Sequence, residues 1–182
     1  MKLWIVRHAK PLIEGGICYG ALDVAADAPH TLQAACALAQ ALPMHCKVWV
    51  SPLQRCMKLA EALFELRPEL KPRTDARLRE MDFGTWEGVA WDAVPLAAMQ
   101  AWTDDFGAHR FGGVESANEV LARVAELWDA ALKDASPCHV WITHAGVARA
   151  AHLLSQGIRT VENANHWPKD APAYGQWRCV SG

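Results

Sequence analysis

Three short apolar segments, each followed directly by polar residues, constrain the fold of this chain most strongly. Residues 4–8 read Trp-Ile-Val-Arg-His, residues 140–144 read Val-Trp-Ile-Thr-His, and residues 47–51 read Lys-Val-Trp-Val-Ser. Each segment has the length of a buried strand, and stretches with helical patterns separate them along the chain. This alternation predicts an α/β fold, a three-layer α/β/α sandwich in which helices cover both faces of a mostly parallel sheet.

The expected helices and strands follow one another over most of the chain. We expect strands at 3–7, 47–51, 70–74 and 139–143, an edge strand near 173–180, and helices at 31–42, 52–66, 117–134 and 146–155. Pro52 is expected at the first position of its helix, where proline is tolerated. Ser116 and Glu119 predict a capping box at the start of the helix that follows them.

Residues 84–113 interrupt this alternation. Glycines recur in this stretch, and Trp86, Trp91 and Trp102 lie between them. We expect a partly helical cap beside the site, inserted into a single domain that spans residues 1–182. The three tryptophans either line the pocket or pack inside the insert, and the sequence leaves both alternatives open.

Composition excludes several classes of protein. With 18 Lys and Arg against 20 Asp and Glu, the chain lacks the basic surface of a nucleic-acid binder. No apolar run approaches the roughly 20 residues of a membrane helix or resembles a signal peptide, so we expect no membrane association and a cytoplasmic location. The six cysteines are scattered without a Cys-x-x-Cys pair. They are expected to be reduced thiols that pack as small apolar side chains, not a disulfide framework or a zinc site.

The polar residues at the strand ends form a candidate site. Arg7 ends the first expected strand and His8 follows it, and His144 follows a later strand. Arg55 lies in the first turn of the helix after residues 47–51. Because ligands bind outside the carboxyl ends of parallel strands, we expect these side chains to meet in one pocket that binds a phosphate. Gly146, near the start of a helix, lets backbone N–H groups approach such an anion.

These residues also belong to five short motifs. In order they are Arg7-His8-Ala9, Ser51-Pro52-Leu53-Gln54-Arg55-Cys56, residues 78–88, residues 112–116, and Thr143-His144-Ala145-Gly146-Val147. The set spans about residues 3–150 and resembles the histidine phosphatase superfamily, also called phosphoglycerate-mutase-like. The segment Cys18-Tyr19-Gly20-Ala21-Leu22-Asp23 resembles the α-ribazole phosphatase branch, which serves cobalamin biosynthesis.

The resemblance implies a histidine acid-type phosphatase, a phosphoric monoester hydrolase. His8 would be the nucleophile that forms a phosphohistidine, with catalytic help from Arg7, Arg55 and His144. Glu80 would protonate the leaving alkoxide and then take a proton from the attacking water. No metal or other cofactor is expected, because cationic side chains would stabilise the phosphoryl oxygens. The expected phosphate-binding residues are Arg7, His8, Arg55, His144 and Ala145.

Some positions depart from the family pattern. Ala9 and Ala145 stand where many members have glycine, and Glu14 stands where many have an asparagine. We therefore expect one phosphate contact to come from elsewhere, namely the loop at residues 18–20.

The expected substrate is a small phosphomonoester such as α-ribazole 5′-phosphate. A broad-specificity phosphatase and a protein-phosphohistidine phosphatase stay open as alternatives. A phosphoglycerate mutase is less favoured, because the stretch between Glu80 and His144 leaves room only for a small cap. A non-catalytic phospho-ligand sensor is a minor alternative. The sequence does not determine the oligomeric state.

Overall fold

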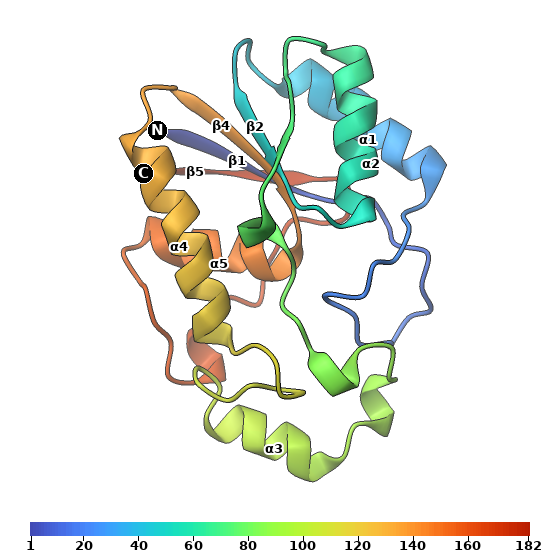
Figure 1. Cartoon of the computed structure of the whole chain (residues 1–182), viewed down its shortest axis with the longest axis vertical. Helices are drawn as coiled ribbons and strands as arrows, with labels where there is room; N and C mark the ends of the chain where they lie inside the picture. Colours follow the sequence, from blue (N-terminus) through green and yellow to red (C-terminus); the bar gives the residue numbers. More distant parts are fainter.

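The computed structural model describes residues 1–182 and places one sheet between two pairs of helices (Figure 1). The strands are β1 (Lys2–Arg7), β2 (Lys47–Val50), β3 (Arg73–Thr74), β4 (Cys138–Thr143) and β5 (Trp177–Ser181). The helices are α1 (Ala28–Ala41), α2 (Gln54–Leu66), α3 (Leu96–Asp104), α4 (Ala117–Lys133) and α5 (Ala145–Ser155). None of these helices combines the length and the apolar character needed to cross a membrane.

The sheet is mostly parallel, as the sequence predicts. Its order is β3-β2-β4-β1-β5. β1 and β2 both pair in parallel with β4, and β3 pairs in parallel with β2. Only β5 runs antiparallel, at the edge beside β1. Four strands therefore end at the same edge of the sheet, so the residues that follow β1, β2 and β4 lie side by side.

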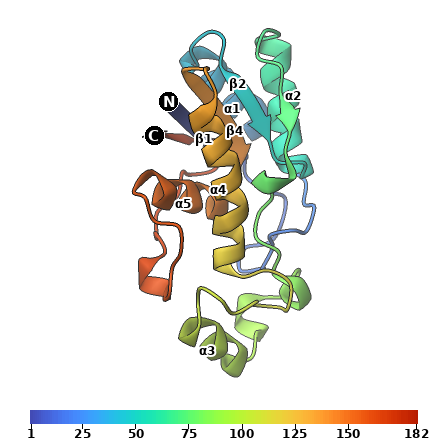
Figure 2. The ribbon, with the colours of Figure 1, turned by 60° about the vertical axis from the view of Figure 1, so that its left-hand side comes forward.

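Alternating side chains of β1 divide the core into two layers. Leu3 and Ile5 pack into the apolar cluster that includes α4 and α5. Trp4 and Val6 pack into the cluster that includes α1 and α2. The two helix pairs lie on opposite sides of the sheet in both views (Figures 1 and 2). The predicted three-layer α/β/α arrangement is confirmed.

The starts of the helices agree with some of the local sequence signals and differ from others. Ser116 and the Glu119 side chain form the expected capping box at α4. α1 begins at Ala28, three residues before the prediction, because the Asp27 side chain caps it by accepting the His30 N–H. The prediction for Pro52 was wrong, because α2 begins only at Gln54.

The stretch at residues 84–113 contains α3 and two short 3-10 turns, Gly84–Trp86 and Trp91–Ala93. In both views α3 lies at the far end of the molecule from the sheet (Figures 1 and 2). Gly112 joins this stretch to the rest with a φ of +81°, and a Cβ there would lie 1.8 Å from the Phe83 carbonyl oxygen. Only glycine fits this close approach of two backbones.

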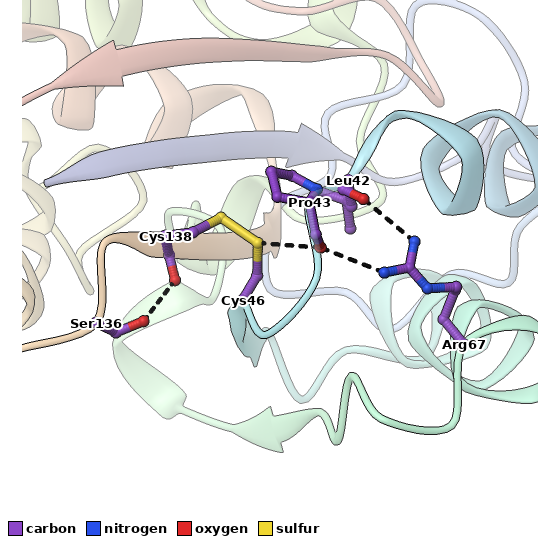
Figure 3. The surroundings of a disulfide bond; sticks show 6 residues. All are labelled: Leu42, Pro43, Cys46, Arg67, Ser136 and Cys138. Atoms are coloured by element: carbon purple, nitrogen blue, oxygen red, sulfur yellow. Dashed lines mark hydrogen bonds between the residues drawn. A yellow bond between two sulfur atoms is a disulfide. The ribbon is translucent and has the colours of Figure 1, made fainter.

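The expectation that all six cysteines are free thiols was wrong for two of them. Cys46 and Cys138 form a disulfide at the amino ends of the adjacent strands β2 and β4 (Figure 3). Their Cα atoms lie 4.8 Å apart, because Lys47 and His139 are register partners and the two cysteines precede them. The two cysteines are 92 positions apart in the sequence, and only the pairing of β2 with β4 brings them together, so spacing alone could not predict the bond.

Candidate active site

His8 follows β1 directly and is 2% exposed. Its Nδ1 lies 2.7 Å from the Ala9 carbonyl oxygen. Because a carbonyl can only accept, Nδ1 carries the proton of the neutral ring and Nε2 keeps a free lone pair. Burial, followed by the positive charge of Arg55, lowers the pKa of His8 from 6.5 to about 3. His8 is therefore a neutral imidazole at pH 7, the form that can act as a nucleophile.

Arg55 lies in the first turn of α2 and is fully buried. Its Nη1 donates to the Leu22 carbonyl at 2.8 Å and its Nη2 donates to the Gly20 carbonyl at 2.6 Å. Its Nε points to Nδ1 of His144 at 3.3 Å. These contacts fix a buried cation beside both histidines.

His144 follows β4, and its ring centroid lies 5.1 Å from that of His8. Because Arg55 can only donate to its Nδ1, the neutral ring carries its proton on Nε2, which donates to Ser51 Oγ at 2.8 Å. Burial, and after it the positive charge of Arg55, lowers the pKa of His144 well below 6.5. Both ring nitrogens are thus bound inside the protein, and a phosphoryl oxygen would have to displace Ser51 to reach Nε2.

Arg7 and two tyrosines complete the surroundings of His8. The Arg7 guanidinium carbon lies 3.9 Å from the centre of the Tyr174 ring, and Arg55 lies 5.4 Å from that of Tyr19. The two tyrosine hydroxyl oxygens are 2.9 Å apart. Each guanidinium group therefore has an aromatic ring beside it, and the two rings are linked. No motif in the sequence pointed to Tyr174, because it lies in the tail outside all five of them.

Glu80 lies at the amino end of α5, where its Oε2 accepts the Gly146 N–H at 3.0 Å. A Cβ at Gly146 would lie 2.3 Å from Oε1 of Glu80, so this helix start admits the carboxylate only with glycine. The expected backbone donor at Gly146 is thus already used by Glu80. Ala145 is the first residue of α5 and directly follows His144, its N-cap.

Glu87 supports the site through backbone contacts that no pattern in the sequence indicates. Its Oε2 accepts the N–H groups of Gly20 and Leu22, and its Oε1 accepts those of Ala21 and Phe83, at 2.9–3.0 Å. The carboxylate therefore holds the loop whose carbonyls bind Arg55. The expected phosphate contact from this loop has no free donor at Gly20, whose N–H binds Glu87.

Two cavities flank Glu80. One, of about 440 Å³, is lined mostly by charged residues, which include Arg79, Asp82, Glu115 and Arg123. The other, of about 250 Å³, is lined mostly by hydrophobic residues, five of which are aromatic. Glu80 lines both, so a group bound in either cavity would lie beside this carboxylate.

Comparisons with known proteins agree with this arrangement. A sequence model of the histidine phosphatase superfamily (branch 1) matches residues 3–170. A search of the curated proteins finds no match.

Solved structures share the fold over nearly the whole chain. A mycobacterial glucosyl-3-phosphoglycerate phosphatase is 26% identical, covering 98% of this chain and 88% of its own, with a TM-score of 0.78. The same phosphatase in complex with VO3 aligns over 99% of this chain and 92% of its own, with 26% identity and a TM-score of 0.80. The protein TTHB049 from Thermus thermophilus is 29% identical over 99% of this chain and 93% of its own, with a TM-score of 0.71.

Proposed function

This chain belongs to the histidine phosphatase superfamily (branch 1) and is a phosphoric monoester hydrolase, and we propose that it works through a phosphohistidine on His8. One observation carries the proposal. His8 is a neutral ring with a free lone pair on Nε2, buried beside the permanent positive charge of Arg55. Such a ring can attack phosphorus while adjacent cations stabilise the charge on the phosphoryl oxygens.

In the first step, Nε2 of His8 forms a bond to phosphorus and the bond from phosphorus to the ester oxygen breaks. Arg7 and Arg55 stabilise the phosphoryl oxygens, which carry the developing charge. Arg55 is fixed by the carbonyls of Gly20 and Leu22, so it needs little rearrangement during the reaction. His144 releases Ser51 Oγ and donates from Nε2 to a phosphoryl oxygen instead.

Glu80 serves both steps as a proton carrier. It gives a proton to the departing alkoxide, which becomes an alcohol. The resulting carboxylate takes a proton from a water molecule that attacks the phosphohistidine, releasing inorganic phosphate and restoring His8. The contact with the Gly146 N–H holds Glu80 at the rim of the two cavities. No metal takes part in these steps.

For the substrate we propose α-ribazole 5′-phosphate. The support is the segment Cys18-Tyr19-Gly20-Ala21-Leu22-Asp23, which resembles the α-ribazole phosphatase branch and which supplies the carbonyls that hold Arg55. A phosphorylated sugar derivative is the second candidate. It is favoured by the cavity of mostly charged residues beside Glu80 and by the similarity to a glucosyl-3-phosphoglycerate phosphatase.

A small-metabolite phosphatase fits the expected cytoplasmic location and the expectation that the protein binds no nucleic acid. The Cys46–Cys138 bond argues against this location, because structural disulfides are rare in strongly reducing compartments. Thiol labelling in freshly lysed cells measures whether these two cysteines are reduced or bonded, and so tests the proposed cytoplasmic location.

The phosphoenzyme tests the proposed chemistry directly. Brief mixing with a ³²P-labelled phosphomonoester and quenching should trap label that is acid-labile and base-stable, as expected of a phosphohistidine. His8→Ala should lose both the label and turnover, whereas His152→Ala, on α5 outside the site, should keep both. Label retained in the folded His8→Ala protein would assign the nucleophile to another residue.

A further inference from the structure

The segment that leads into β5 holds the backbone of the two candidate residues at the end of β1. The Gly175 N–H donates to the carbonyls of Arg7 and His8, at 3.2 and 3.0 Å. The Arg7 N–H in turn donates to the Gln176 carbonyl at 2.9 Å. The match to the family model ends at residue 170 and leaves out this segment, residues 172–176. A part of the chain that carries none of the five motifs therefore contacts the candidate nucleophile.

The same segment holds the side chain of Arg7 on two sides. Its Nη1 donates to the Pro172 carbonyl at 3.1 Å, and its guanidinium carbon lies 3.9 Å from the centre of the Tyr174 ring. Its Nε is buried and has no acceptor in the protein. Nη2 is therefore the nitrogen that is left to bind a phosphoryl oxygen, and its direction depends on the plane of the guanidinium. Because the Tyr174 ring covers one face of that plane, the ring helps to set this direction.

Tyr174 is held in turn by Tyr19. The two hydroxyl oxygens lie 2.9 Å apart, and each ring lies beside a different arginine, Tyr174 beside Arg7 and Tyr19 beside Arg55. The Tyr174 ring is also 5.6 Å from the ring of His8. Burial, followed by the hydrogen bond to Tyr174, raises the pKa of the Tyr19 hydroxyl, which therefore stays protonated at pH 7. One hydrogen bond thus connects the aromatic groups beside both arginines.

Packing in the core does not account for the position of Tyr174. The residue is only partly buried, and it belongs to neither of the two apolar clusters that flank the sheet. Its ring and hydroxyl contact Arg7, His8 and Tyr19 instead. A substitution at Tyr174 should therefore change the site more than it changes the stability of the core.

From these contacts we infer that Tyr174 is a positioning residue for phosphate binding. Its ring holds the guanidinium of Arg7 in the orientation that binds the phosphoryl group, and its hydrogen bond to Tyr19 holds the ring. The inference rests on the proposed role of Arg7. Because every substrate shares the phosphoryl group, Tyr174 should affect all esters alike. Glu80 acts on the leaving group, so its effect should differ between esters.

Removal of the ring tests the contact with Arg7. Tyr174→Leu should raise the inhibition constant of inorganic phosphate by about threefold to thirtyfold, as the loss of a cation–π contact allows. It should lower kcat/KM for p-nitrophenyl phosphate and for ribose 5-phosphate by the same factor. Inorganic phosphate has no leaving group, so its inhibition constant reports on the phosphate site alone. Phe64→Leu replaces a 40% exposed ring on α2, outside the site, and is the matched control that should keep the wild-type values.

Two conservative variants test the hydrogen bond between the tyrosines. Tyr174→Phe and Tyr19→Phe each keep the ring and remove one hydroxyl. Each should raise the inhibition constant of phosphate by about twofold to fivefold, less than Tyr174→Leu does. Because both hydroxyls make the same bond, the double variant should lose no more than either single variant. Losses that multiply in the double variant would show that the two hydroxyls act separately, which contradicts the inferred link.

The phosphoenzyme separates this inference from the proposed function. The tyrosine variants should still form the base-stable label on His8. If folded Tyr174→Leu binds phosphate as the wild type does, or loses activity with only one of the two esters, Tyr174 does not position Arg7 and the proposed function stands. If the wild-type enzyme forms no phosphoenzyme and hydrolyses neither ester, the proposed function fails instead. If Tyr174→Leu does not fold, the two phenylalanine variants decide the inference, because they keep both rings.

Discussion

His8 and His144 face each other at 5.1 Å but differ in their hydrogen bonds, and this difference separates their roles. His8 donates from Nδ1 to a backbone carbonyl and keeps Nε2 free. His144 accepts from Arg55 and donates to Ser51, so both its nitrogens are used. The sequence could identify these residues because each directly follows a strand. It could not give the protonated nitrogen of either ring, which depends on partners that the fold brings in.

Glu80 should matter most for substrates whose leaving group needs a proton. Glu80→Gln should strongly lower kcat/KM for an alkyl phosphate such as a ribose 5-phosphate ester. It should lower the value for p-nitrophenyl phosphate much less, because nitrophenolate leaves without protonation. The comparison applies where phosphoenzyme formation limits the rate, which a burst measurement establishes. Equal losses on both substrates would mean that Glu80 positions water or supports the fold. Asp82 would then be the next acid to test. Glu87 is the less suitable candidate, because both oxygens of its carboxylate already accept backbone N–H groups.

The buried histidines should make the fold sensitive to acid. Since the pKa of His8 is about 3 in the fold and near 6.5 in the unfolded chain, the unfolded chain binds more protons between these values. The free energy of unfolding should therefore fall as the pH drops below about 6.5, by at most ~1.4 kcal/mol per pH unit for this group. Urea unfolding at pH 7, 6 and 5 measures this slope. His8→Asn should make it shallower, and an unchanged slope would show that His8 is not the group responsible.

At the level of elements, the regular helices and strands were predictable and the connections were not. The strands that precede His8 and His144, and the capping box of α4, follow from local patterns in the sequence. No local pattern predicts the hydrogen bonds from the loop at residues 18–23 to Glu87, because the carboxylate is 65–67 positions away from these N–H groups in the sequence. The pairing of Tyr19 with Tyr174 has the same cause.

Glu87→Gln should loosen the loop that holds Arg55. The amide has one acceptor oxygen, so two of the four backbone N–H groups lose their acceptor in either orientation of the side chain. We expect the free energy of unfolding to fall by about 2–3 kcal/mol, and KM to rise as Arg55 loses its fixed position. Urea unfolding and steady-state kinetics measure both effects. Glu126→Gln, at a side chain that is 71% exposed, is the control and should match the wild type. If Glu87→Gln is as stable as the wild type, the Glu87 carboxylate does not hold the loop in place.

For the whole molecule, the disulfide ties together two segments that the sequence keeps far apart. Because Cys46 and Cys138 are separated by 92 positions, breaking their bond should lower the free energy of unfolding by about 2–4 kcal/mol. The bond lies at the amino ends of β2 and β4, opposite the candidate site, so kcat should not change. Cys138→Ala tests this by denaturation and kinetics, with Cys179→Ala, at an exposed free cysteine, as the control. Equal stability of the two variants would show that the bond does not form in solution.

The order in which the strands pair has a consequence for how the protein is made. β1 carries Arg7 and leads directly into His8, yet it pairs only with β4 and β5, the last two strands of the chain. The Gly175 N–H also donates to the carbonyls of both residues. At about 5–20 residues per second, a ribosome needs roughly 7–27 s to go from Arg7 to Thr143, the end of β4. During that time the apolar strand has no hydrogen-bonding partner. A nascent chain therefore carries its candidate nucleophile long before it has an active site, and chaperones that shield β1 would act in this interval.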